Sequence, residues 1–336
     1  MGGGVTPRDI EYDVEHGLDH DVDPSADHDV EHGFEYEHDV VVLGGTGVDT
    51  TVYVPELPLA YQDTYHVPPV IDRIGNTGSG VALGCHALGL RVTLIDLIGE
   101  DPQGRLVRDH LAGRGVRLVW ARSEAGTTRS VLLVGPDGRR LSLHDPRSVP
   151  GARLPRELYL PALRTARHVH VSITDFCRHV YPDIPDGVTI STDLHDWDGV
   201  NPYHADFAYA SDLVFLSATA LGGRREEVMR DIAARGRASL VVCTAGAGGC
   251  HVLDAGRGDT RHFPAQPLPG PVADSNGAGD AFVSGVLYGR LRGLPLEECV
   301  MLGGIAGAHA CTSTGTHEDP IALDALLERR RGLHVR

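Results

Sequence analysis

The stretch from Asp274 to Gly285 holds the residues of this sequence that are best suited to chemistry, a Gly-Ala-Gly turn that opens an apolar segment. Three successive small residues, Gly277, Ala278 and Gly279, let backbone N–H groups converge on an anion at the start of a helix. Asp280 comes next, where its carboxylate could accept the proton of a hydroxyl that attacks a bound phosphate. An aspartate in a first helical turn also complements the helix dipole. Taken alone, the segment leaves a catalytic base and a helix cap equally open.

Other carboxylates and arginines offer further candidates. Asp49 follows a buried strand, at the edge where α/β sheets place ligands, although an ordinary turn aspartate has the same surroundings. The run Asp193-Leu-His-Asp-Trp-Asp198 suits either a metal site or a solvated loop whose Trp packs on the sheet, and the loop is the favoured interpretation. Arg147, just after a hairpin, is the arginine that we expect to contact a charged group of the substrate.

Composition excludes several classes of protein. Every basic residue is Arg. A Walker A loop and a protein-kinase fold each require a lysine, so both are excluded, and any phosphate that this chain binds must be held by backbone amides and Arg. The formal charge of −16 without a basic stripe argues against a nucleic-acid partner. Apolar runs stay far below the roughly 18 residues of a membrane span, and the N-terminal residues show no basic-then-apolar pattern, so export is not expected. Six scattered cysteines are expected as small core residues in a reducing compartment.

Residues 1–38 are expected to form a disordered, acidic and His-rich tail. They hold 12 carboxylates against Arg8 alone, and Asp13-Val-Glu-His-Gly17 recurs as Asp29-Val-Glu-His-Gly33. Such a segment lacks the apolar surface that would offset the entropy of ordering. Weak binding of a divalent metal is a less favoured alternative. Its ligands would be the acids together with His16, His20, His28, His32 and His38.

Residues 39–336 are expected to form one α/β domain with a doubly wound, mainly parallel sheet flanked by helices. The β-branched run after Asp39 predicts a first buried strand, and strand-like and helical segments then alternate. Two excursions interrupt this alternation, at about residues 50–72 and 127–145, and the second contains the hairpin turn Gly135-Pro-Asp-Gly138. We expect these excursions to form a small β-strand lid.

The later elements are predicted from the same patterns. The expected strands are 92–98, 117–120, 168–173, 188–192, 213–216 and 240–244, followed by a hairpin-like segment. The expected helices are 79–90, 103–114, 155–165, 225–235, 278–291, 296–313 and 321–330.

The segment around Asp280 strongly resembles the second signature of the ribokinase family, also called PfkB carbohydrate kinases. That signature reads Asp-Thr-x-Gly-Ala-Gly-Asp, with Ser275 here in place of Thr. The matching residues are Asp274, Gly277, Ala278, Gly279 and Asp280. The resemblance extends over nearly all of residues 39–330. It implies a ribokinase-like fold and ATP-dependent transfer of phosphate to a hydroxyl of a sugar, sugar acid or nucleoside, with Asp280 as the base.

The resemblance also implies where ligands bind. The family's substrate loop corresponds to Arg73–Gly80, and the aspartate that binds sugar hydroxyls corresponds to Asp49. With Arg147 added, the substrate-binding residues are Asp49, Gly75, Asn76, Gly80 and Arg147. The implied nucleotide-binding residues are Thr244, Gly246, Gly249, Asn276 and His309. A monovalent cation, K⁺, would be held by Asp274, Ser275 and Gly315.

Two departures from the family pattern affect these expectations. The second glycine of the substrate loop is Asn76 and the usual asparagine is Gly80, so Asn76 is expected to supply a substitute amide. The family's Asn-x-x-Glu, which helps to organise Mg²⁺ and phosphate, is replaced by Ser217-Ala-Thr-Ala220. Either phosphoryl transfer is weak, or Mg²⁺ is held mainly by nucleotide phosphates and water. In the second case the nearby acid would be Asp193, Asp196 or Asp198.

An active cytoplasmic kinase that uses ATP and Mg²⁺ is the favoured interpretation. The alternative is a catalytically weak or inactive sugar- or nucleotide-binding regulatory protein. A dinucleotide-dependent oxidoreductase is weaker still, because it depends only on Gly45-x-Gly47. Relatives that resemble ribokinase pair through their lids, which implies a homodimer through the β lid, with no nucleic-acid or membrane partner.

Overall fold

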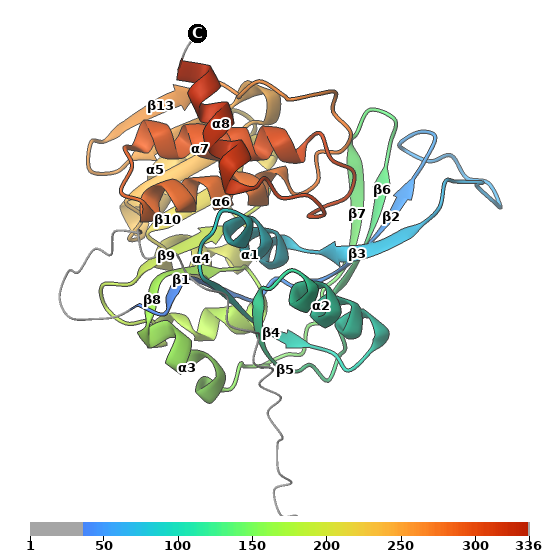
Figure 1. Ribbon diagram of the computed structural model, residues 1–336, viewed down its shortest axis with the longest axis horizontal. Coiled ribbons are helices and arrows are strands. Elements are labelled where there is room, and N and C mark those ends of the chain that lie inside the picture. The colour runs from blue at the N-terminus through green and yellow to red at the C-terminus, as the bar shows by residue number, and fades with distance from the viewer. Residues whose placement is uncertain (1–35, 335–336) are drawn as a thin grey trace, which may run out of the picture. The chain divides into compact units, whose positions relative to one another are not determined.

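The computed structural model describes residues 36–334. These residues contain a nine-stranded sheet (Figure 1). Neighbouring strands are parallel except at the β11–β12 and β12–β13 pairs. In spatial order the strands are β13 (Asp259–Phe263), β12 (Cys250–Asp254), β11 (Leu240–Thr244), β10 (Leu213–Ser217), β9 (Thr189–Asp193), β8 (Ala166–Val171), β1 (His38–Leu43), β4 (Val92–Ile98) and β5 (Arg117–Arg122). The predicted doubly wound, mainly parallel sheet is confirmed.

The central strand β1 explains where a ligand can bind. Its β-branched residues Val40–Val42 are completely buried, as expected for a parallel strand covered on both faces. From β1 the chain adds β4 and β5 on one side, and later β8 and its neighbours on the other. Such a reversal of strand order leaves a crevice at the carboxyl ends of the two central strands. Residues that follow β1 and β8 therefore lie where α/β sheets place their ligands.

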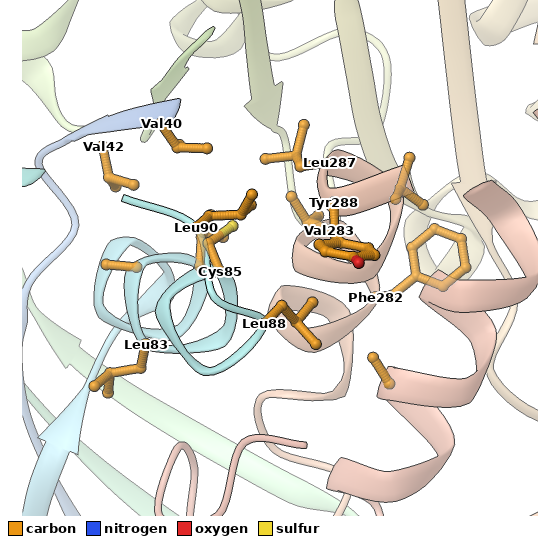
Figure 2. Packing of buried hydrophobic residues seen from close by; sticks show 14 of the residues in the cluster. Val40, Val42, Leu83, Cys85, Leu88, Leu90, Phe282, Val283, Leu287 and Tyr288 are labelled. Carbon is orange, nitrogen blue, oxygen red and sulfur yellow. The ribbon is translucent and has the colours of Figure 1, made fainter. Parts of the chain in front are cut away.

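Helices cover both faces of the sheet, because alternate side chains of each strand point to opposite sides. Val40 and Val42 of β1 pack in one apolar cluster, whereas Val41 and Leu43 pack in the other. The first cluster holds residues of α1 (Thr77–Ala87), α2 (Pro102–Gly113), α6 (Ala278–Leu291), α7 (Leu296–Ala310) and α8 (Leu323–His334). The second holds residues of α3 (Arg156–Arg164), α4 (Ala205–Ala210) and α5 (Arg225–Arg235). Figure 2 shows Cys85 and Leu88 beside Val283 and Leu287 in the first cluster.

The predicted lid is a separate four-stranded sheet beside the main one (Figure 1). Its order is β3 (Ile71–Gly75), β2 (Gly47–Tyr53), β6 (Arg129–Val134) and β7 (Arg140–Asp145). β2 and β6 pair in parallel, and the other pairs are antiparallel. Residues 54–70 connect β2 to β3 without forming a strand. Gly47 opens β2 and not a helix, which removes the structural basis for a dinucleotide fingerprint.

The structure differs from the sequence predictions mainly at the ends of elements. α1 begins two residues earlier than predicted, after Asn76, whose φ of 66° breaks the preceding strand. α4 was not predicted, because six residues carry too little periodicity. His38 belongs to β1 and not to the tail, and its buried ring lies 3.2 Å from the Thr93 hydroxyl. The predictions for the rest of the tail fall outside the described residues.

The cysteines lie where the sequence predicts them. All six are free thiols, of which five are buried and Cys311 is half-buried. Within residues 36–334, no helix is both long and apolar enough to cross a membrane.

The core can be tested at Leu287 of α6, which is 1% exposed and packs in the same apolar cluster as residues of α1. We expect Leu287→Ala to lower the free energy of unfolding by about 2–5 kcal/mol, because the lost contacts leave a cavity. Urea unfolding followed by circular dichroism measures the change. Leu268→Ala is the matched control, since Leu268 is 45% exposed and its truncation should change stability by less than about 0.5 kcal/mol. Equal losses in the two variants would contradict this assignment of the core.

Candidate active site

Asp280 lies in the first turn of α6, where the predicted Gly-Ala-Gly turn begins the helix. Gly277 caps the helix with φ of 72°, and a Cβ there would lie 2.0 Å from the Thr316 carbonyl oxygen. Only glycine fits this position. Gly279 is exposed at the same helix end, and the nearest atom to a Cβ there would be Asp193 Oδ2 at 4.0 Å. The N-terminus of α6 therefore has open space for an anion beside Asp280.

Asp280 is surrounded by other carboxylates. Its side chain is buried, with 7% of the residue exposed. Burial raises the pKa of Asp280 well above its usual range, and the charges of Asp193 and Asp49 raise it further, whereas Arg140 lowers it. Burial likewise raises the pKa of Asp49. A carboxylate with a raised pKa is a stronger proton acceptor, as a general base near neutral pH requires.

The predicted substrate loop packs directly against these carboxylates. A Cβ at Gly75 would lie 2.1 Å from Asp49 Cγ, and the backbone N–H of Asn76 donates to the Asp49 carboxylate. A Cβ at Gly80 would lie 2.7 Å from Asp280 Cβ. The Asn76 side-chain nitrogen is buried and has no hydrogen-bond partner among residues 36–334. The structure thus brings Gly75, Asn76 and Gly80 to the carboxylates and leaves the Asn76 amide able to donate to a ligand.

The arginine of the lid that reaches this cluster is Arg140, not Arg147. Arg140 Nη1 donates to Asn276 Oδ1 in the Gly-Ala-Gly segment, and its charge lowers the pKa of both Asp49 and Asp280. Arg147 instead donates from Nε to Asp145 Oδ2 (2.7 Å) and from Nη1 to the Ala125 carbonyl (3.1 Å). The reason is the alternation of strand β7, which puts Arg140 on the same face as His144. Arg147 lies beyond the end of that strand.

The lid supports Asp49 through a short chain of hydrogen bonds. Ser130 of β6 lies opposite Asp49 of β2 and hydrogen-bonds its carboxylate. The Ser130 hydroxyl is also 3.1 Å from His144 Nδ1 in β7. Thr316, from the loop that follows α7, donates to Asp49 Oδ2 at 3.3 Å. Asp49 is therefore held by the lid on one side and by the C-terminal part of the chain on the other.

The predicted nucleotide-binding residues lie at the ends of β11 and α7. Thr244 ends β11, and Gly246 and Gly249 adopt φ of 55° and 82° in the turn that follows. No atom lies within 4 Å of a Cβ built at Gly246, so this turn has room for a ligand. His309 lies in the last turn of α7, with its ring 3.6 Å from Asp319. Asn276 is bound to Arg140, as described above, and the nucleotide contacts of all five residues remain predictions.

Of the three residues predicted to hold a monovalent cation, Asp274 has the arrangement that suits this role best. Asp274 is fully buried, and its Oδ1 accepts from Asn276 N at 2.9 Å. Its Oδ2 has no hydrogen-bond partner in the described part of the chain, an arrangement that suits a bound cation. Gly315 is buried with φ of 94°, next to Arg73. The Ser275 hydroxyl donates instead to the Gly138 carbonyl of the lid hairpin (3.4 Å).

Of the three acids considered for Mg²⁺, Asp193 is the one beside the site. Its charge raises the pKa of Asp280, whereas Asp196 is exposed. Asp198 accepts hydrogen bonds from the backbone N–H groups of Val200 and Asn201 and so stabilises the loop that contains it. Trp197 packs in the core, as the loop interpretation predicted. No group of three or more His, Cys, Asp or Glu is arranged to hold a metal in the described part of the chain.

The loop after α7 adds two further residues of the site that were not predicted, Thr316 and His317. His317 Nε2 lies 3.6 Å from Asp280 Oδ2, and the ring occupies the space beside Gly80. The departure at Gly80 was the available signal, because a missing side chain next to a catalytic residue leaves volume that another residue must fill. The sequence alone could not identify which residue fills it.

Comparisons with known proteins find relatives in both sequence and fold. A profile of the pfkB family of carbohydrate kinases matches residues 204–322. Acarbose 7(IV)-phosphotransferase of Actinoplanes sp. is 51% identical over 294 residues, which cover 87% of this chain and 98% of that protein. The solved structure of the microbiome-derived acarbose kinase Mak1 aligns with a TM-score of 0.82 at 41% identity and covers 87% of this chain and 98% of Mak1. Arabidopsis thaliana ribokinase with ribose and ATP aligns with a TM-score of 0.73 at 19% identity, over 87% and 98% of the two chains, a likeness of fold.

The effect of Arg140 on Asp280 gives a pH-dependent prediction. With Asp280 as the base that the sequence predicts, the active form is the ionised carboxylate, so the rate should fall as the pH drops through the pKa of Asp280. Arg140→Ala removes the charge that lowers this pKa, and we expect the acidic limb of the kcat/KM profile to move to higher pH. Initial rates measured between pH 5 and 9 test this. Arg147→Ala is the control and should leave the limb in place; a shift in the control alone would contradict the assignment.

Proposed function

This chain belongs to the pfkB family of carbohydrate kinases and is an ATP-dependent sugar kinase, and we propose that its acceptor is acarbose or a close structural analogue. The family and the activity predicted from the sequence are confirmed. The observation that carries the substrate proposal is the 51% identity to acarbose 7(IV)-phosphotransferase over 98% of that protein. The similar proteins are named as phosphotransferases and kinases, which favours an active enzyme over a binding protein without turnover.

In the mechanism that we propose, Asp280 is the general base. The acceptor hydroxyl lies against the Asp280 carboxylate, and its oxygen attacks the γ-phosphorus as the proton passes to Asp280. The bond from the γ-phosphorus to the bridging oxygen of ADP then breaks. Burial of Asp280 among carboxylates supports this role, because it raises the proton affinity of the base.

The N-terminus of α6 would stabilise the transferring group. Backbone N–H groups of the Gly277–Gly279 turn point to developing negative charge on the phosphoryl oxygens. Arg140 adds a positive charge from the lid, and it already contacts Asn276 in the same segment. Asp49, with Gly75 and Asn76, would bind the hydroxyls of the sugar and exclude water when the lid is closed.

Cations would complete the site. Mg²⁺, held mainly by ATP phosphates and water with Asp193 nearby, would neutralise phosphate charge. The free, buried Oδ2 of Asp274 supports a monovalent cation there, with K⁺ as the candidate and Gly315 beside it. We also propose a cytoplasmic location, supported by the six free thiols.

A homodimer through the lid is a further part of the proposal. Leu141 and Leu143 of β7 are 48% and 56% exposed, although both are large and apolar. They pair with Leu133 and Val131 of β6, so these four residues share one face of the lid. That face is opposite to the one that carries Ser130 and Asp49. An exposed apolar face on a sheet supports association with a second copy of the chain.

The substrate proposal is tested by phosphorylation assays with ATP and Mg²⁺. We expect kcat/KM for acarbose to exceed the values for ribose, fructose, fructoselysine and cytidine by at least about 100-fold, an order expected when polar groups of the site are matched to one acceptor. The position of the new phosphate is then read by NMR of the product. A higher kcat/KM for any of the small acceptors would reject acarbose as the substrate class while leaving the kinase activity intact.

The base is tested by Asp280→Asn, which keeps the shape of the side chain and removes its ability to accept a proton. We expect kcat to fall by at least about 10²-fold, while the affinity for ATP measured by calorimetry stays within about two-fold. Asp196→Asn is the control, because Asp196 is exposed and its charge is not among those that shift the pKa of Asp280. Retention of wild-type kcat in Asp280→Asn would refute the assignment of the base.

A further inference from the structure

We propose that His317 is a positioning residue that fixes the carboxylate of Asp280 and joins it to the substrate loop, in the volume that a side chain at position 80 would otherwise fill. The inference rests on the proposed role of Asp280 as the base. It concerns a residue from the loop between α7 and α8, far from Asp280 in the sequence. The argument begins with the contacts of the imidazole ring.

One nitrogen of the ring has two oxygen neighbours. His317 Nε2 lies 3.1 Å from the carbonyl oxygen of Asn76 and 3.6 Å from Asp280 Oδ2. A backbone carbonyl can only accept a hydrogen bond, so Nε2 must carry the proton. The same N–H is therefore near an oxygen of the base. A distance of 3.6 Å is too long for a hydrogen bond in the free enzyme, but such contacts often tighten when substrate binds.

The other side of the ring meets the Gly-Ala-Gly turn. A Cβ at Gly277 would lie 2.9 Å from His317 Nδ1 and 3.1 Å from Cε1. The imidazole thus touches the substrate loop at Asn76, the start of α6 at Gly277, and the carboxylate of Asp280. These are the three parts of the site that must keep a fixed geometry during transfer, because the acceptor, the phosphate and the base each lie on one of them.

Gly80 is what makes room for the ring. A Cβ at Gly80 would lie only 2.3 Å from His317 Cε1 and 2.8 Å from Nδ1. The ring and a side chain at position 80 therefore exclude each other. Where the resemblance to the ribokinase family leads us to expect an asparagine, this chain has Gly80, and the polar group beside Asp280 comes from His317 instead.

The ring presents one N–H, on Nε2, to the oxygens of Asn76 and Asp280. The charges of Asp49 and Asp193 repel the Asp280 carboxylate, whereas the N–H of His317, 3.6 Å away, attracts one of its oxygens and favours one orientation. We infer that this restraint keeps one carboxylate oxygen free for the acceptor hydroxyl.

The test compares two replacements of the ring in the full-length enzyme. His317→Phe fills the same volume without an N–H, and we expect kcat to fall about 10- to 100-fold, while KM for ATP changes less than about two-fold. His317→Gln retains an N–H donor, and we expect its kcat to be at least about five-fold higher than that of His317→Phe. Wild-type kcat in His317→Phe, or equal losses in both variants when both are folded by circular dichroism, would overturn the proposal.

Failure of the inference about His317 can be told apart from failure of the proposed role of Asp280. If Asp280→Asn keeps its turnover, the proposed role of Asp280 fails and the positioning role fails with it. If Asp280→Asn is inactive and His317→Phe has wild-type kcat, the inference about His317 alone is rejected.

Discussion

Three positions without side chains allow this site to exist. Gly75, Gly80 and Gly277 bring backbone so close to Asp49, His317 and Thr316 that a Cβ at any of them would overlap another atom at 2.0–2.3 Å. Backbone cannot withdraw from such a contact as a flexible side chain can. The substrate loop, the start of α6 and the loop after α7 therefore fit together in one arrangement. The positions of the Asp49 and Asp280 carboxylates depend on that arrangement.

This close fit concentrates like charges. The charges of Asp49 and Asp193 act on Asp280, and burial raises the pKa of both Asp49 and Asp280. Arg140 offsets part of the repulsion, and it belongs to the lid. A strongly basic carboxylate and a nearby phosphate site are what phosphoryl transfer to a hydroxyl requires. The chemistry therefore follows from the packing of the backbone as much as from the identity of the acids.

Much of the fold could be predicted from the sequence, because its signals are local. Runs such as Val40–Val42 and Leu240–Thr244 have the β-branched composition of buried strands, and the Gly-Ala-Gly turn with Asp280 is contiguous. Arg140 could not be preferred over Arg147 without the exact ends of β7, since a shift of one residue exchanges the two faces of a strand. His317 depends on a tertiary approach to Gly80 that no local pattern encodes.

The contacts between the lid and the Gly-Ala-Gly segment have a consequence for how new specificities arise. Arg140 donates to Asn276, and the Gly138 carbonyl accepts from Ser275, so the lid hairpin is attached to the segment that we propose holds the phosphate. A mutation that reshapes the hairpin for another acceptor also moves groups next to the reacting phosphate. Adaptation to a new sugar along this lineage would thus proceed by paired changes, one in the hairpin and one near Asn276, and single changes in the hairpin would trade turnover for selectivity.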